Sequence, residues 1–192
     1  YVSNGLVEDC VIRNTVSQTN SHGEGAYITG GRMTRCVFKN CNYYGEPFKA
    51  SVVTMKGGVL ENCLFTGNKL TTLHNTNRPG LIAFAGNATV VNCTIVANQN
   101  HSSIGINVAD LALASGTCQA IDCTIGDGFA AGHELYVAGT CLAKNCTVRN
   151  TKGLPLVEQA DSGQVEGLTL DDGAEIEATR PLKVYGSKSG TG

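Results

Sequence analysis

Cysteine is the residue type in this chain with the widest chemistry, because thiolates bind metals, form disulfides and act as nucleophiles. The chain has 192 residues and nine cysteines, which is an odd number, and it contains no CxxC motif. Six cysteines recur at intervals of 23 to 30 residues, namely Cys10, Cys36, Cys63, Cys93, Cys123 and Cys146. This spacing is typical of a structural repeat rather than of a zinc site. We therefore expect a column of reduced, buried thiols that holds no metal and no other cofactor.

Two further cysteines, Cys118 and Cys141, are each preceded by Gly-Thr and lie five residues before a member of the main column. They predict a second, shorter stack, and they are the best-placed pair for a disulfide if one forms. Cys41 is then the odd thiol, at the entrance of a loop.

A set of charged residues near the end of the chain offers a second chemistry, the hydrolysis of glycosidic bonds. That reaction uses two carboxylates about 5 to 9.5 Å apart. Asp127 and Asp172 occupy the same place in different repeats, with Arg149 in the repeat between them and Asp171 beside them. Stacked repeats would separate the two carboxylates by about 10 Å. Asp127, Arg149 and Asp172 are thus the alternative catalytic set, although acidic residues at the end of a strand are also common on plain surfaces.

The variable segments between repeats are rich in Asn, Ser, Thr and Gln and contain aromatic and histidine side chains. The residues best suited to bind a ligand are Tyr43, Tyr44, His74 and His101. Amides and hydroxyls hydrogen-bond to sugar hydroxyls, and aromatic rings stack on sugar faces. This composition favours neutral glycans, and it is equally typical of ordinary surface loops.

The repeat predicts the elements that position all these residues. Apolar residues stand three positions before and two positions after each cysteine of the main column, as in LVEDCVI and VVNCTI. The residue between is often threonine, with apolar neighbours on both sides, which is the alternation of a strand with one buried face. Another strand precedes each of these segments (AYIT, SVVTM, LIAF, LALA, LYVA and LPLVEQ), usually followed by a glycine turn.

The position immediately before each cysteine predicts a sharp bend. It holds Asp9, Arg35, Asn62, Asn92, Asp122, Asn145 and finally Gly167. Asn, Asp and Gly tolerate the left-handed backbone conformation best, so Arg35 is the exception and predicts strain or a modified turn. Asparagine amides at equivalent bends also form hydrogen-bonded ladders in stacked strands.

One coil is therefore a strand, a glycine turn, a strand, an Asn bend, a strand and a variable loop. The sequence predicts an all-β, parallel β-helix solenoid with three parallel sheets and about seven or eight coils. We expect a single domain over residues 1–192, with coils over about 5–172 and a closing strand and tail over 173–192.

The Asn-Cys-Thr-Ile segments followed by Asn, together with GAYITGGRMTRCVFKN and GGVLENCLFTGN, resemble the right-handed parallel β-helix repeats of the pectin lyase-like superfamily. They are similar to the Asn-Cys- and Gly-rich repeats of bacterial cell-surface proteins and autotransporter passengers. The resemblance covers residues 5–172 and implies the fold, and the superfamily implies contact with polysaccharides. Its polygalacturonase motifs, Asn-Thr-Asp and Arg-Ile-Lys, are missing, so no catalytic residue carries over.

Composition and charge limit the function classes. The net charge is −2, with no run of Lys or Arg and no long apolar stretch, which argues against nucleic acid and membrane insertion. We expect a non-catalytic extracellular or cell-surface module of a bacterial protein, structural or adhesive, whose partner is a polysaccharide or host glycan. The alternative is a polysaccharide lyase or glycoside hydrolase. Because the repeat begins at once without a cap, we also expect either preceding coils or end-to-end self-association.

Overall fold

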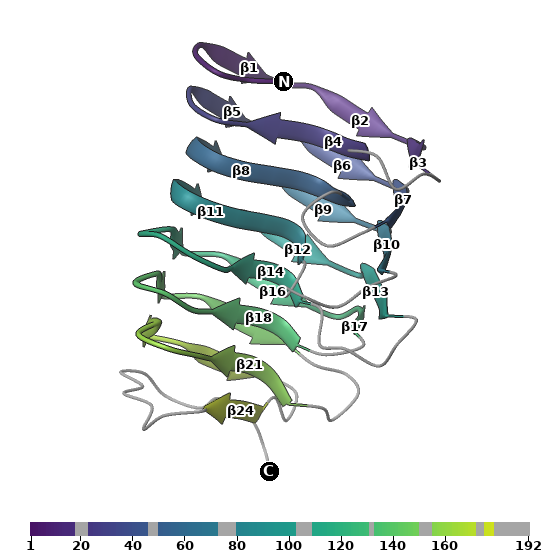
Figure 1. Cartoon of the computed structure of the whole chain (residues 1–192). Helices are drawn as coiled ribbons and strands as arrows, with labels where there is room; N and C mark the ends of the chain where they lie inside the picture. The colour runs from purple at the N-terminus through teal and green to yellow at the C-terminus, as the bar shows by residue number, and fades with distance from the viewer. Residues whose placement is uncertain are drawn as a thin grey trace.

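The chain winds repeatedly around one narrow core, so that equivalent segments of successive coils lie side by side (Figure 1). The computed structural model describes residues 1–17, 23–45, 50–72, 80–102, 109–130, 133–149, 155–171 and 175–178. Over these residues the secondary structure is entirely β, and the paired strands are parallel. The predicted all-β parallel solenoid is confirmed.

Sheet A has twelve strands. They are β1 (Leu6–Glu8), β4 (Gly23–Ile28), β5 (Arg32–Thr34), β8 (Ala50–Glu61), β11 (Gly80–Val91), β14 (Ala109–Leu113), β15 (Gln119–Ile121), β18 (His133–Val137), β19 (Leu142–Lys144), β21 (Pro155–Gln159), β22 (Gln164–Glu166) and β24 (Glu175–Ala178). The last of these, β24, pairs with β21 and so continues the sheet beyond the seventh coil.

Sheets B and C complete each coil. Sheet B has seven strands, one per coil: β2 (Val11–Arg13), β6 (Val37–Lys39), β9 (Leu64–Thr66), β12 (Thr94–Val96), β16 (Thr124–Gly126), β20 (Thr147–Arg149) and β23 (Thr169–Asp171). Sheet C has five: β3 (Val16–Ser17), β7 (Asn42–Gly45), β10 (Lys69–Thr72), β13 (Gln99–Ser102) and β17 (Phe129–Ala130).

The number of sheets matches the prediction, but their composition does not. The two strands on either side of the glycine turn belong to one sheet, and in the third and fourth coils they are continuous twelve-residue strands, β8 and β11. Gly58 and Gly86 stand inside these strands with φ of 82° and 86°. At Gly86 a Cβ would lie 2.5 Å from the Lys56 carbonyl oxygen, so only glycine lets neighbouring coils approach here. Sheet C comes from segments that were expected to be loops.

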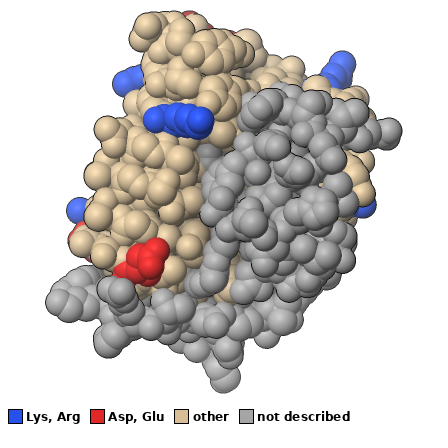
Figure 2. All heavy atoms as spheres, in the orientation of Figure 1, with Lys and Arg blue, Asp and Glu red and all other residues tan. Residues whose placement is uncertain are grey.

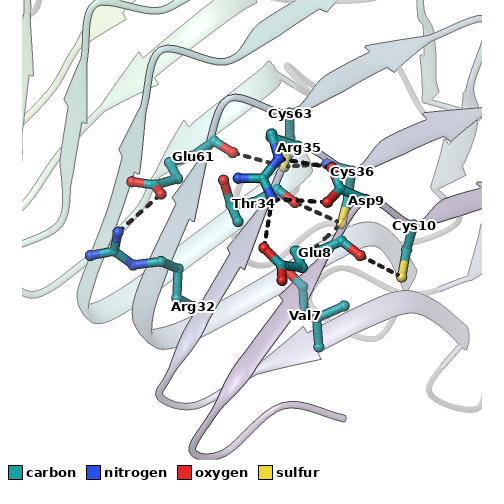
Figure 3. A network of polar contacts seen from close by, with 10 residues as sticks. All are labelled: Val7, Glu8, Asp9, Cys10, Arg32, Thr34, Arg35, Cys36, Glu61 and Cys63. Carbon is teal, nitrogen blue, oxygen red and sulfur yellow. Dashed lines mark hydrogen bonds and ion pairs between the residues drawn. The ribbon is translucent and has the colours of Figure 1, made fainter.

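The predicted bend before each cysteine is confirmed. Every residue of that column has φ between 48° and 60°, including Arg35 at 50°. Arg35 donates hydrogen bonds of 2.8 Å to both carboxylate oxygens of Asp9, and one of 2.6 Å to Glu8 (Figure 3). This guanidinium holds the pKa of the Asp9 carboxyl below its usual range. Arg35 therefore makes these ion pairs from a left-handed backbone conformation that arginine rarely adopts.

The cysteine column forms part of the core, as expected. Five of its six members are at most 2% exposed, and they are Cys36, Cys63, Cys93, Cys123 and Cys146. The stacked rings of Phe38 and Phe65, with centroids 4.6 Å apart, fill the space beside them. The expectation of burial is wrong for Cys10, which is exposed because it belongs to the first coil. Cys41 is also a core residue rather than a loop thiol, at 1% exposure.

Backbone hydrogen bonds set the register between coils. In coils two to seven, the residue after the column position, which is Cys in coils two to six and Leu168 in the seventh, donates its N–H to the carbonyl of the preceding coil's cysteine over 2.8 to 3.0 Å. These donors are Val37, Leu64, Thr94, Thr124, Thr147 and Thr169. Each coil thereby templates the next one.

Two asparagine ladders run along the stack, of which the sequence predicted one. At the first bend, Asn92 Nδ2 donates to Asn62 Oδ1 over 2.7 Å, and both side chains are exposed. At the corner between sheets B and C, Asn68 and Asn98 are fully buried. There Asn68 Oδ1 accepts the Cys41 N–H, while Asn68 Nδ2 donates to the Phe38 carbonyl and to Asn98 Oδ1, each over 3.0 Å.

We predict that Asn68→Leu lowers the free energy of unfolding by about 3 kcal/mol, because it leaves the buried Cys41 N–H and Phe38 carbonyl without hydrogen bonds. The matched change in the exposed ladder, Asn62→Gly, keeps the left-handed backbone and is expected to cost less than about 1 kcal/mol. Urea unfolding followed by circular dichroism measures both. Equal losses in the two variants would contradict the importance of the buried ladder.

Candidate functional site

The outer face of sheet C is the strongest candidate for a ligand-binding surface. Parallel register places Tyr44, Thr71 and His101 side by side in one column of β7, β10 and β13. Tyr44 is 39% exposed, and Thr71 is half-buried. The neighbouring column on the same face runs from β7 to β13 and holds the exposed residues Asn42, Lys69 and Gln99. The face combines an aromatic ring with amide, hydroxyl and ammonium groups in successive rungs.

Two of the four residues predicted to bind ligands are thus brought together by the backbone register, Tyr44 and His101. Tyr43 differs, because it points inward: it is 3% exposed, and its hydroxyl hydrogen-bonds to the Thr15 hydroxyl over 2.6 Å. Alternation along a strand sends adjacent residues to opposite faces, so Tyr43 and Tyr44 cannot both line one surface. The expectation of an exposed ring is wrong for Tyr43. His74 lies outside the described residues.

The candidate catalytic residues meet at the exit of sheet B. Arg149 Nη1 lies 3.5 Å from Asp127 Oδ2, and Arg149 Nε lies 3.7 Å from Asp171 Oδ2. All three side chains are partly exposed. Asp172, the partner that the sequence favoured, lies outside the described residues, and the contact with Arg149 is made by its neighbour Asp171.

The position of Arg149 determines which chemistry this cluster can perform. Asp127 and Asp171 belong to coils two apart, which corresponds to about 10 Å along the stack. Inverting hydrolysis needs the scissile bond and a water molecule between the two carboxyl groups. Here the Arg149 guanidinium occupies that position and contacts both carboxylates. In this arrangement the cluster is an ion-pair ladder rather than an open acid–base pair.

A buried acidic pair was missed at the sequence level. Asp110 on β14 and Glu134 on β18 occupy equivalent positions in adjacent strands and are 1% and 2% exposed. Both interrupt otherwise apolar strands, in ADLAL and HELYV, and this shared interruption is the signal that could have revealed them. The next residue column, Leu111 and Leu135, belongs to the core.

The two carboxyl groups share a hydrogen bond, which requires a proton on one of them. Burial, followed by the charge and hydrogen bond of Glu134, raises the pKa of Asp110 well above its usual value. Asn98, the end of the buried ladder, hydrogen-bonds to Asp110 and opposes this shift. At pH values between the ordinary pKa of Asp and this raised pKa, the folded fifth and sixth coils therefore retain a proton that the unfolded chain releases.

Neither a metal-binding cluster nor a membrane-spanning helix is found among the described residues. No group of three or more His, Cys, Asp or Glu side chains there is placed to hold a metal ion. No helix among these residues has the length and apolar character needed to cross a membrane.

Comparison with protein families identifies the fold family. The model of the right-handed β-helix region matches residues 1–171, nearly the whole chain. The chain belongs to the right-handed β-helix family. No curated protein and no solved structure matches it. Membership confirms the resemblance in the repeat and gives the hand of the coil, while a fold shared by many activities assigns none of them.

The pKa shift of Asp110 predicts a pH-dependent stability. Below about pH 4, the ordinary pKa of Asp, the folded and unfolded chains both bind this proton. The stabilisation that the protonated pair gives to the fold is then fully present. As the pH rises towards the raised folded pKa, only the unfolded chain releases the proton, so the free energy of unfolding falls. Asp110→Asn, which mimics the protonated group, should flatten this decline and unfold at higher urea than the wild type at pH 8.

Urea midpoints measured from pH 4 to pH 8 test this prediction. Asp127→Asn is the matched control, because Asp127 is partly exposed and its change should leave the slope of midpoint against pH as in the wild type. Parallel pH profiles for Asp110→Asn and the wild type would show that the buried pair does not hold the proton.

Proposed function

We propose that this chain is a non-catalytic structural and adhesive module of an extracellular bacterial surface protein, which contacts neutral glycans through the outer face of sheet C. The observation that carries the proposal is the column of Tyr44, Thr71 and His101 beside Asn42, Lys69 and Gln99. An exposed aromatic ring offers a stacking surface to a sugar, and amides and hydroxyls supply both donors and acceptors.

The shape of the fold supports this role. Strands about 4.8 Å apart present side chains at regular intervals along the stack, and a polymer of similar units could contact several rungs at once. Solenoids with such extended faces commonly bind along them. Figure 2 shows the side of the solenoid on which sheet A lies in Figure 1, and charged side chains are few and scattered among the described residues there.

The first coil supports end-to-end self-association with a second copy of the chain. In the first coil, Val7 and Ile12 are only partly buried, whereas their register partners in the second coil, Met33 and Phe38, are 4% and 0% exposed. Val11 is equivalent to Val37, whose N–H bonds to the preceding coil, so the Val11 N–H is placed to bond to a coil stacked on the first one. Such an apolar strand edge is a ready template for pairing.

A second function is favoured by one observation, the contact of Arg149 with Asp127 and Asp171. If an approaching polysaccharide displaced the guanidinium, the two carboxylates would flank the chain of sugars. This candidate is a polysaccharide lyase or glycoside hydrolase.

For the glycan-binding surface, we predict that Tyr44→Ala weakens the binding detected on a glycan array by at least about fivefold, since one ring–sugar contact is worth about 1 kcal/mol or more. Tyr1→Ala is the matched control, because Tyr1 is 82% exposed but lies away from sheet C. Unchanged binding by Tyr44→Ala, or an array without any bound glycan, would count against this surface.

For self-association, sedimentation velocity should show oligomers of the wild type that grow with concentration. Val11→Pro removes the free N–H and should give monomers, whereas Val11→Ala keeps the N–H and should weaken association only in part. A wild type that stays monomeric at all concentrations would exclude stacking through this edge.

For the enzymatic alternative, we expect no release of reducing ends and no unsaturated products from a panel of plant and microbial polysaccharides. Reducing-sugar and ultraviolet absorbance assays measure the two reactions. The non-catalytic assignment would be overturned if the wild type turned over a polysaccharide and Asp127→Ala abolished this activity. Circular dichroism would have to show that the variant is still folded.

A further inference from the structure

Cys118 and Cys141 lie at the same turn in the fifth and sixth coils. Each immediately precedes a strand, β15 and β19, whose first residues Gln119 and Leu142 are register partners. Both thiols are fully buried, but they lie directly beneath a surface turn, because Thr117 and Thr140 beside them are exposed. Adjacent parallel strands place equivalent Cα atoms about 4.8 Å apart, within the roughly 4.4 to 6.8 Å range of disulfides.

The two thiols contact each other and the turn carbonyls. Cys118 Sγ lies 3.4 Å from the Gly86 oxygen, and Cys141 Sγ lies 3.6 Å from the Gly116 oxygen. The side chains also hydrogen-bond to each other. This hydrogen bond from Cys141 lowers the pKa of Cys118 to about 7, and it raises the pKa of Cys141. Near neutral pH the pair thus has an attacking thiolate with a second thiol beside it.

The surroundings distinguish this pair from the main cysteine column. Ala88 precedes Cys118 at the equivalent position of the fourth coil, and Gly163 follows Cys141 in the seventh, so the residues above and below the pair are small. In the main column, the sulfurs of Cys63 and Cys93 each accept a backbone N–H of the preceding coil over 3.4 Å. Those sulfurs accept backbone hydrogen bonds inside the core. Cys118 and Cys141 instead have small neighbours along the stack, which leaves room for the change of side-chain rotamer that a disulfide requires.

We propose that Cys118 and Cys141 are a redox-active thiol pair that a small-molecule disulfide converts into a covalent link between the fifth and sixth coils. The Cys118 thiolate attacks one sulfur of glutathione disulfide and forms a mixed disulfide, releasing one glutathione thiolate. Cys141 then loses its proton to solvent, attacks the Cys118 sulfur and expels the second glutathione. In the balance, two protein thiols are oxidised to one disulfide and one glutathione disulfide is reduced to two glutathione molecules.

The disulfide would be a reversible cross-link in the middle of the solenoid. It closes the segment between Cys118 and Cys141, which contains β15, β16, β17 and β18, and so restricts the separation of neighbouring coils. It depends on the geometry of the turn alone, and it holds whether or not sheet C binds glycans.

The test uses the full chain with Cys10→Ser, which removes the exposed thiol. The reduced protein is incubated with glutathione disulfide at pH 7, quenched with acid and N-ethylmaleimide, and mapped by peptide mass spectrometry. We expect a Cys118–Cys141 cross-link that dithiothreitol reverses, while Cys123 and Cys146 remain thiols. The oxidised protein should also unfold at higher urea than the reduced one, and Cys118→Ser should abolish this difference.

A second variant separates reactivity from simple proximity. In Cys141→Ala, the Cys118 thiol loses its hydrogen-bond donor, so its pKa should return towards about 8.5 and its alkylation at pH 7 should slow by about tenfold. The pH profile of the alkylation rate should shift upward accordingly. The proposal is overturned if Cys123 and Cys146 cross-link as fast, if Cys118 accumulates only the glutathione adduct, or if no thiol is lost.

Discussion

The hydrogen bond between each coil and the carbonyl of the preceding coil's cysteine is the interaction on which the rest of this structure depends. It requires every coil to return to the same register, whatever the length of its variable segment. Sharp bends achieve this, and they need residues in the left-handed conformation at the same place in each coil. The bends thus set where each strand begins, and the strands set which side chains form columns.

Because the coils stack in register, equivalent residues of successive coils contact one another and form columns. A cysteine in one coil lies against the cysteine of the next, so the core contains a stripe of thiols, and Cys118 and Cys141 form a second, shorter stack at a turn. A buried asparagine is tolerated because the next one satisfies its amide. The same stacking brings Asp110 against Glu134, and the hydrogen bond between these two acids requires a proton on one of them.

The outer faces carry the functional proposals for the same reason. Register places Tyr44, Thr71 and His101 in one column, and it places Arg149 between Asp127 and Asp171. The first is an open surface of ring and polar groups, and the second is closed by its own ion pairs. A rigid scaffold with one face available for contact fits an adhesive or structural module, while the arginine explains why a pair of acids at a suitable position is not by itself an active site.

The sequence by itself determined the coil, because the main column and the bend before it repeat the same residue types: Asn, Asp or Gly where φ is positive, and Cys where the core is narrow. It did not reveal the second bend, which uses Asn14, Asn40, Gly67, Ala97 and Asp127, because so varied a set gives no clear pattern. Only the tertiary structure decided that the expected loops begin with sheet C, that Tyr43 is buried while Tyr44 is exposed, and that Asp110 and Glu134 meet. Each of these depends on which residues become neighbours between coils, and that register is set by hydrogen bonds across the stack rather than by any local segment.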